Sequence, residues 1–142
     1  MFSKEQSKEI RQQFWIFFDK RYPRKWLLYN TGIKDVSLKF DFDTKKAIVG
    51  IDSTSNDEIY RTYYFDKLLS LKNILKEEVS PNLIFDEHYM LSSGKFITRC
   101  YLQLDGVSIH NKNTWPEVFD FFNTYMDKLE RFYIEYKDYI AS

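Results

Sequence analysis

The sequence predicts an α+β fold in which antiparallel hairpins form one sheet packed against helices, in the order α-β-β-α-β-β-α. Two pairs of short segments alternate apolar and polar residues, which is the pattern of strands with one buried face. Three longer segments place apolar residues at helical spacing and follow helix-capping residues. No linker or low-complexity tract divides the 142 residues, so residues 1–142 are interpreted as a single α+β domain.

Each predicted helix follows a capping box, in which two side chains satisfy free N–H groups at the helix start reciprocally. The three pairs are Ser3 with Gln6, Ser55 with Glu58, and Thr114 with Glu117. They predict helices over residues 4–21, 57–78 and 115–139. Pro116 supports the third start, because the first turn of a helix does not use its N–H groups within the helix.

The first hairpin is predicted between the first two helices, with a turn over residues 43–46. Its register pairs Phe42 with Ala47, Phe40 with Val49, and Leu38 with Ile51. Every apolar residue of the alternating pattern then falls on one face, so the register is internally consistent. A short extra strand is also expected over residues 26–29.

The second hairpin is predicted to pair residues 83–91 with residues 96–104 across a turn over 92–95. This register directs the following residues inward: Leu83, Phe85, Tyr89, Leu91, Phe96, Cys100, Leu102 and Leu104. Alternation also turns Glu87 inward beside Cys100, where burial raises a carboxyl pKa and could produce a general acid. The favoured alternative is a bulge or an edge position that leaves Glu87 outside the core.

No pattern in the chain indicates catalysis, a metal or a cofactor. One cysteine and two histidines, widely spaced, match no zinc motif, and Cys100 is interpreted as a buried structural thiol. With four glycines, the chain also has little material for a phosphate-binding loop, and none of the usual loop motifs is present. We therefore assign no catalytic residue, no metal ligand and no cofactor.

Outward-facing polar residues on the two hairpins are the candidates for catalytic or metal-binding chemistry. The predicted register puts Asp52 opposite Ser37, which separates it from Asp41 by about 13 Å along the strand. Ligands of one Mg²⁺ lie about 2.1 Å from the ion, so a nuclease-like metal pair is disfavoured. On the second hairpin, Arg99 is predicted opposite His88 in a surface network of cross-strand polar pairs, which we favour over a proton-transfer cluster.

Two polar loops are the candidate binding site. The residues assigned to it are Arg24, Lys25, Trp26, His110, Asn111, Lys112, Asn113 and Trp115. The first loop closes the first helix and the second opens the third helix, whose N-terminal N–H groups favour an anion. If the loops approach one another, they could bind a small anion or nucleic acid. The alternative is that the first loop is an ordinary helix C-terminus and the second an elaborate N-cap.

Composition sets further expectations about partners and location. Lys and Arg together equal Asp and Glu at 21 each, so nucleic acid could bind only where positive charge gathers on one face. The stretch Phe14–Phe18 is apolar on all sides of its helix and could be covered by a second subunit in a homodimer. The chain shows no signal peptide and no membrane-spanning run, so a cytoplasmic, soluble protein without membrane contact is expected.

Several motifs resemble those of bacterial domain-of-unknown-function family 4268. They are Phe14-Trp15, Tyr22-Pro23-Arg24-Lys25-Trp26, Tyr29-Asn30-Thr31 and Ser108-Ile109-His110-Asn111-Lys112-Asn113-Thr114-Trp115. The resemblance covers most of the chain and implies no assigned activity. Similar domains occur alone or at the C-terminal end of longer proteins, some with a nuclease-like region in front. The resemblance therefore implies some association with nucleic acid or defence systems.

The predicted function is an uncharacterised binding or interaction domain without catalytic activity. The runner-up is a nucleic-acid-associated enzyme or a degenerate, nuclease-like accessory domain.

Overall fold

One antiparallel sheet and a layer of helices make up the computed structural model, which describes residues 2–142. Its elements are α1 (Lys4–Arg21), β1 (Val36–Phe42), β2 (Lys46–Ser53), α2 (Glu58–Ser70), α3 (Lys72–Glu78), β3 (Ile84–Met90), β4 (Phe96–Asp105), the 3-10 turn η1 (Lys112–Thr114) and α4 (Trp115–Ala141). The strand order is β1-β2-β4-β3. The predicted α+β class is confirmed, and the predicted order of elements is found except that two helices, α2 and α3, replace the predicted second helix.

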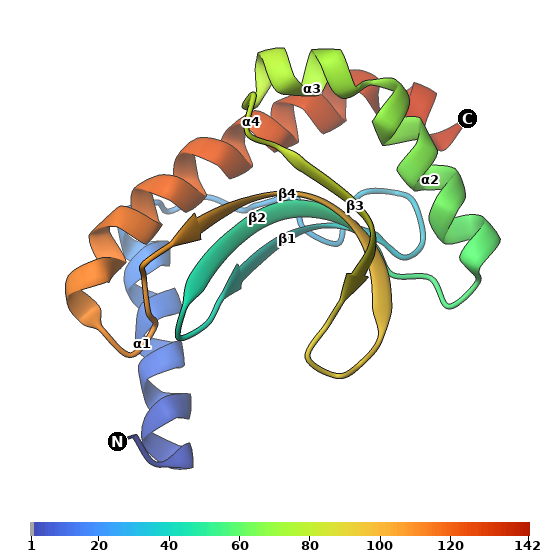
Figure 1. Ribbon diagram of the computed structural model, residues 1–142. Helices are drawn as coiled ribbons and strands as arrows, with labels where there is room; N and C mark the ends of the chain where they lie inside the picture. The colour runs from blue at the N-terminus through green and yellow to red at the C-terminus, as the bar shows by residue number, and fades with distance from the viewer. Residues whose placement is uncertain (1) are drawn as a thin grey trace.

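The sheet is strongly curved, and its two faces differ. Figure 1 shows α4 lying along the convex face while the concave face carries no helix. Gly50 lies on the concave side of β2, where a Cβ atom would come within 2.8 Å of the Cys100 carbonyl oxygen and of the Tyr101 Cβ. Glycine therefore permits the close approach of β2 and β4 at the centre of the curved sheet.

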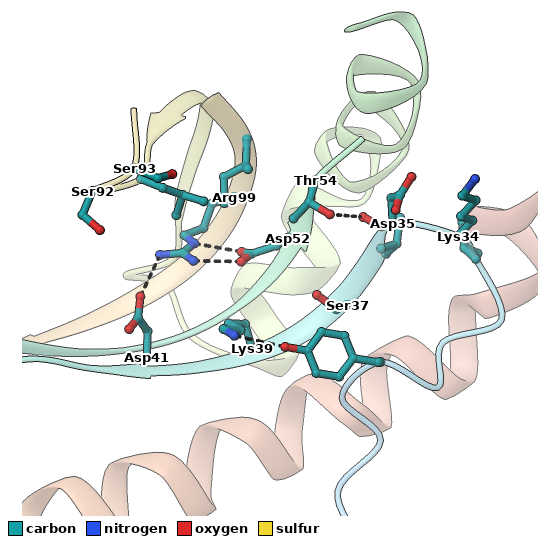
Figure 2. A pocket seen from close by; sticks show the side chains of 15 residues that line it. Lys34, Asp35, Ser37, Lys39, Asp41, Asp52, Thr54, Ser92, Ser93 and Arg99 are labelled. Carbon is teal, nitrogen blue, oxygen red and sulfur yellow. Dashed lines mark hydrogen bonds and ion pairs between the residues drawn. The ribbon is translucent and has the colours of Figure 1, made fainter. Parts of the chain in front are cut away.

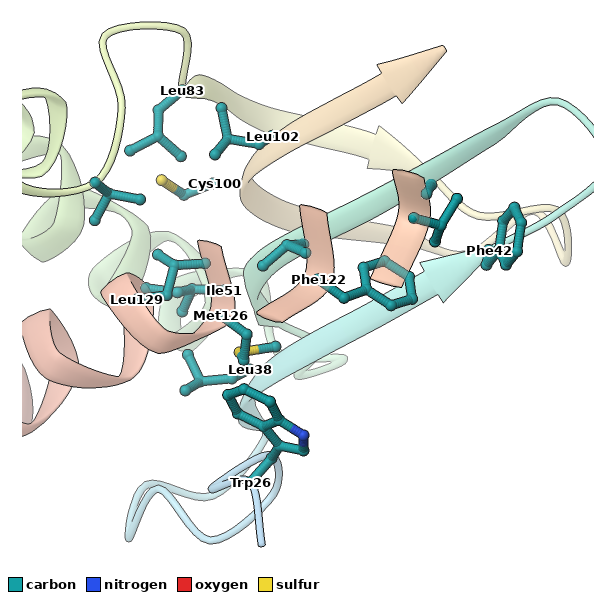
Figure 3. Close-up of a cluster of buried hydrophobic side chains, with 14 of the residues drawn as sticks. Trp26, Leu38, Phe42, Ile51, Leu83, Cys100, Leu102, Phe122, Met126 and Leu129 are labelled. Carbon is teal, nitrogen blue, oxygen red and sulfur yellow. The ribbon is translucent and has the colours of Figure 1, made fainter. Parts of the chain in front are cut away.

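The core lies between the convex face and the helices (Figure 3). The first hairpin has the predicted register, with Leu38 opposite Ile51, Phe40 opposite Val49 and Phe42 opposite Ala47. Buried side chains from this face meet buried residues of α4. The residues drawn and labelled there include Leu38, Phe42, Ile51, Cys100, Leu102, Phe122, Met126 and Leu129. The alternation of apolar and polar residues therefore predicts correctly which face of the first hairpin packs on the core.

The second hairpin differs from its predicted register. Asp86, rather than His88, lies opposite Arg99, and the register shifts between Asp86 and Tyr89. This bulge leaves Glu87 exposed, which is the alternative favoured from the sequence. It also moves Tyr89 from the core face to the concave face, where its ring stacks edge-on against Tyr101.

Two further expectations about the strands are corrected. Phe96 was expected to point into the core, but it is the first residue of β4 and its side chain is 48% exposed. Residues 26–29 do not form a strand. Their one backbone bond to β1 runs from the Leu38 N–H to the Leu28 carbonyl, and Leu28 has a left-handed φ of 47° that breaks the extended conformation.

The helix starts follow the sequence in part. Ser3 and Gln6 form the predicted capping box of α1. The N-cap of α2 is Asp57 instead of Ser55, because the Asp57 carboxylate accepts the Ile59 N–H while the Ser55 hydroxyl accepts the N–H of Asp57 itself. Thr114 caps no N–H of α4, since its hydroxyl bonds to Ser108 across the preceding loop.

The predicted second helix is two helices, since α2 ends before Leu71 and α3 begins after it. Between residues 2 and 142, no helix combines the length and the apolar character that crossing a membrane requires.

Candidate ligand site on the concave face

The first predicted binding loop contacts α4 through Arg24 and does not present Arg24 as an open anion site. Arg24 donates to Asp127 at 2.9 Å and to Glu130 at 2.6 Å, and both carboxylates belong to α4. The guanidinium also lies 3.9 Å from the centroid of the Trp26 ring, and Trp26 is buried. The backbone N–H of Leu27 donates to the other oxygen of Glu130. Of the three assigned residues, Lys25 is exposed, whereas Arg24 and Trp26 are engaged within the chain.

The second predicted binding loop is an organised N-terminal approach to α4. Trp115 is buried and donates its indole N–H to the Ile109 carbonyl at 3.0 Å. Asn111 caps η1 by accepting the N–H of Asn113. Neither Trp115 nor Trp26 can therefore offer the stacking face that the sequence suggested.

The structure does not bring these two loops together. His110 is within 3.2 Å of the Ser7 hydroxyl, near the start of α1, whereas the loop with Arg24 leaves the end of α1. The 18 residues of α1 make a helix about 27 Å long. Along α4, Lys112 precedes the first residue while Arg24 binds Asp127, about 18 Å further on. A joint anion site of the two loops is therefore not formed.

A cleft of about 570 Å³ lies instead on the concave face. It extends from the segment before β1 to the turn between β3 and β4, and the strands form its floor. Its lining residues are Tyr29, Ile33, Lys34, Asp35, Val36, Ser37, Lys39, Asp41, Asp52, Thr54, Leu91, Ser92, Ser93, Ile97 and Arg99. Figure 2 shows the polar side chains rising from the face of the sheet that is opposite α4.

The floor of the cleft holds a buried ion pair. Arg99 on β4 lies directly opposite Asp52 on β2, because the strand order places these two strands side by side. Arg99 donates from Nε and Nη2 to the two carboxylate oxygens of Asp52, both at 2.8 Å. The side chains are 1% and 4% exposed. The Tyr89 ring centroid lies 4.4 Å from the guanidinium carbon and covers it on one side.

The remaining guanidinium nitrogen, Nη1 of Arg99, is buried and has no hydrogen-bond partner. Its nearest opposite charge is Oδ2 of Asp41 at 3.6 Å, which is an ion pair without a hydrogen bond. The Asp41 side chain is 47% exposed and belongs to β1 (Figure 2). The cleft therefore contains a fixed cation whose Nη1 atom has no hydrogen-bond acceptor.

Burial and pairing act in opposite directions on the ionisation of this pair. Burial raises the pKa of the Asp52 carboxyl above its ordinary value, and the hydrogen bonds and charge of Arg99 oppose that rise. Burial lowers the pKa of the Arg99 guanidinium, but the hydrogen bonds and charge of Asp52 outweigh it, so that this pKa is raised. The guanidinium stays charged, and a charged donor with a free N–H is a strong site for an acidic group.

Polar and strained residues surround the pair. Lys39 lines the cleft and donates to the Tyr29 hydroxyl at 3.1 Å. Asp35, at the rim, has a left-handed φ of 64°, and its carbonyl accepts the N–H of Thr54. A non-glycine residue in this conformation is uncommon and often lies at a binding site. Among residues 2–142, no group of three or more His, Cys, Asp or Glu is arranged to hold a metal ion.

A family match covers most of this structure. The family described as Domain of unknown function (DUF4268) matches residues 10–137. The chain belongs to the DUF4268 family. No curated protein and no solved structure matches the chain.

The DUF4268 match contains every residue that lines the cleft, from Tyr29 to Arg99. Many residues of the motifs quoted for the family are structural supports. Arg24 and Trp115 are two of these supports. Thr31 is a third support: it is buried, and its carbonyl accepts the Tyr133 hydroxyl of α4 at 2.7 Å. The motifs thus fix α4 and the segment before β1, and that segment forms one wall of the cleft.

Sequence reasoning missed the pair of Arg99 and Asp52 at the floor of the cleft for a specific reason. It compared Asp41 with Asp52 along one hairpin and placed Arg99 opposite His88 on the other. Neither comparison included the pairing of β2 with β4, which puts Arg99 against Asp52. The available signal was that Asp52 and Arg99 are the charged residues within strand faces that otherwise carry apolar or small residues, Ile48 and Gly50 on β2 and Ile97 and Tyr101 on β4.

Proposed function

We propose that this DUF4268 protein is a binding domain whose ligand occupies the concave-face cleft and carries an acidic group. The observation that carries the proposal is the Nη1 atom of Arg99, buried at the cleft floor without an acceptor. Buried donors in proteins are nearly always satisfied, and leaving a charged one unsatisfied costs free energy. A ligand oxygen at this atom would satisfy the donor.

The dimensions and lining of the cleft support a small ligand. Its volume of about 570 Å³ is within the range of small-molecule sites. The central ion pair and its neighbours Ser37, Lys39 and Asp41 stand on strands, and Ser92 and Ser93 add hydroxyls from the hairpin turn. Sites on strands hold their geometry better than sites on loops alone.

The charges of the cleft favour a small ligand over a polynucleotide, the runner-up. Nucleic acid binding depends on positive charge that is segregated from negative charge. Here Lys34 and Lys39 share the lining with Asp35 and Asp41. Both oxygens of Asp52 are already bound by Arg99, which favours binding over proton transfer by that carboxylate.

The test is a thermal-shift comparison of three probes at matched ionic strength: acetate, inorganic phosphate and a thymidine oligonucleotide. We expect acetate to raise the Tm of the wild-type protein, because a ligand that binds only the folded state stabilises it by mass action. Lys39→Ala is expected to reduce this shift, since Lys39 supplies a second cation at the cleft. Lys45→Ala, on the exposed turn between β1 and β2, is the matched control and should retain the full shift.

Two results would reject the proposed site. One is a shift of equal size in the wild type, Lys39→Ala and Lys45→Ala, which would mean that acetate acts on the whole surface. The other is the absence of any acetate or phosphate shift. A shift with the oligonucleotide alone would favour the nucleic-acid function instead.

A further inference from the structure

We infer that the ligand of the cleft is a free amino acid with an apolar side chain, bound through its carboxylate and its ammonium group. The inference rests on the proposed function and specifies the class of ligand. Its basis is the combination of one unsatisfied cation, one loosely held carboxylate and an apolar wall in a single cleft.

The carboxylate site follows from how Arg99 is shared. Asp52 takes the Nε and Nη2 atoms at 2.8 Å in a two-bond contact, which fixes the guanidinium plane. Asp41 is only 3.6 Å from Nη1 and makes no hydrogen bond, so it is a weak occupant of that position. A ligand carboxylate that displaces Asp41 from Nη1 gains a hydrogen bond that Asp41 does not make.

The ammonium site follows from what displacement does to Asp41. Once a ligand carboxylate binds Nη1, Asp41 loses its nearest counter-charge and faces a second negative group across a short distance. A ligand with only an acidic group therefore carries a repulsion in the bound state. In an α-amino acid the ammonium group is on the carbon next to the carboxylate, so it reaches Asp41 and removes that repulsion.

The overall charge of the cleft agrees with a ligand of no net charge. Arg99 and Asp52 neutralise one another through their two hydrogen bonds. The remaining charged residues of the lining are two of each sign: Lys34, Lys39, Asp35 and Asp41. A zwitterion keeps this balance, whereas a phosphate group would add negative charge beside Asp35 and Asp41.

The side chain of the ligand has an apolar wall available. Ile33 precedes β1 and Leu91 follows β3, and both are partly exposed and line the same cleft as Arg99. Apolar contacts of this kind bind aliphatic groups by removing their surface from water. Leucine is therefore the probe of choice.

The experiment compares leucine with two analogues that each lack one charge. Isothermal titration of the full chain would use leucine, 4-methylpentanoate (no ammonium) and 3-methylbutylamine (no carboxylate). We expect leucine to bind at least about tenfold more tightly than either analogue, since each loses a charge-assisted contact. Asp41→Asn is expected to weaken leucine by about tenfold and to leave 4-methylpentanoate unchanged or tighter.

A matched control and the contrary outcomes complete the test. Asp19→Asn changes an exposed carboxylate of α1, on the helix layer, and should leave all three affinities unchanged. If 4-methylpentanoate binds as tightly as leucine in a manner sensitive to Lys39→Ala, the zwitterion inference is wrong while the acidic-ligand site stands. If neither leucine nor its analogues bind, the inference is rejected, and the acetate and phosphate shifts decide the proposed function separately.

Discussion

Replacing Arg99 by Met is expected to produce a large loss of stability. The substitution keeps an extended side chain but removes the charge, which leaves the Asp52 carboxylate buried without a partner. Asp52 is only 4% exposed and loses two hydrogen bonds of 2.8 Å. Breaking such a buried pair costs about 3–5 kcal/mol, which lowers Tm by about 10–17 °C in a chain of 142 residues.

The assay is urea unfolding followed by circular dichroism, with two companion variants. The double variant Asp52→Leu/Arg99→Met removes both charges, and we expect it to recover most of the loss, since an apolar pair of similar volume needs no counter-ion. Arg131→Met is the matched control. It breaks the exposed pair with Asp127 and should cost less than about 1 kcal/mol.

The pattern across these variants distinguishes the possible causes. A loss below about 1 kcal/mol for Arg99→Met would show that the pair is not buried as the structure has it. If the double variant is as unstable as the single one, the shape of the arginine rather than its charge supports the sheet. The reasoning about a buried unpaired carboxylate would then be wrong.

Three further predictions concern other parts of the chain. Burial raises the pKa of the Cys100 thiol, so we expect no reaction with a disulfide reagent at mildly alkaline pH until urea unfolds the protein, as measured by absorbance. Hydrogen bonds from Arg24 and Arg131 lower the pKa of Asp127. The charged Asp127 carboxylate therefore stabilises the folded protein at pH values above the ordinary carboxyl pKa, and this contribution is lost as the pH falls through the lowered value. The stability difference between wild type and Asp127→Asn should therefore shrink on acidification, and a difference independent of pH would contradict this. For the predicted homodimer, Phe14 and Phe18 are buried within the chain, and Ile16 and Phe17 remain 51% and 45% exposed. Because this pair is small beside the area that stable interfaces bury, we expect light scattering to give a monomer of 17.3 kDa. A dimer that Phe17→Lys dissociates would instead support the self-association that the sequence predicts.

The sequence alone determined the features that depend on neighbours along the chain. The register of the first hairpin followed from alternation across a short turn, where a slip of one residue would expose the apolar face. The start of α1 followed from the Ser3 capping box, which is complete within four residues. The family motifs were also readable, although their role as supports for α4 was not.

Only the tertiary structure decided where the cleft lies. The bulge between Asp86 and Tyr89 adds an unpaired residue that alternation cannot register, and it moves Tyr89 onto the concave face. The length of α1 separates the two loops that chemistry alone suggested joining. The order β1-β2-β4-β3 brings Arg99 against Asp52, 47 positions apart in the chain. A periodic pattern shows which face of a strand a side chain occupies, but which strands become neighbours is set by the packing of the whole chain, so the buried ion pair and its unsatisfied nitrogen appear only in the folded protein.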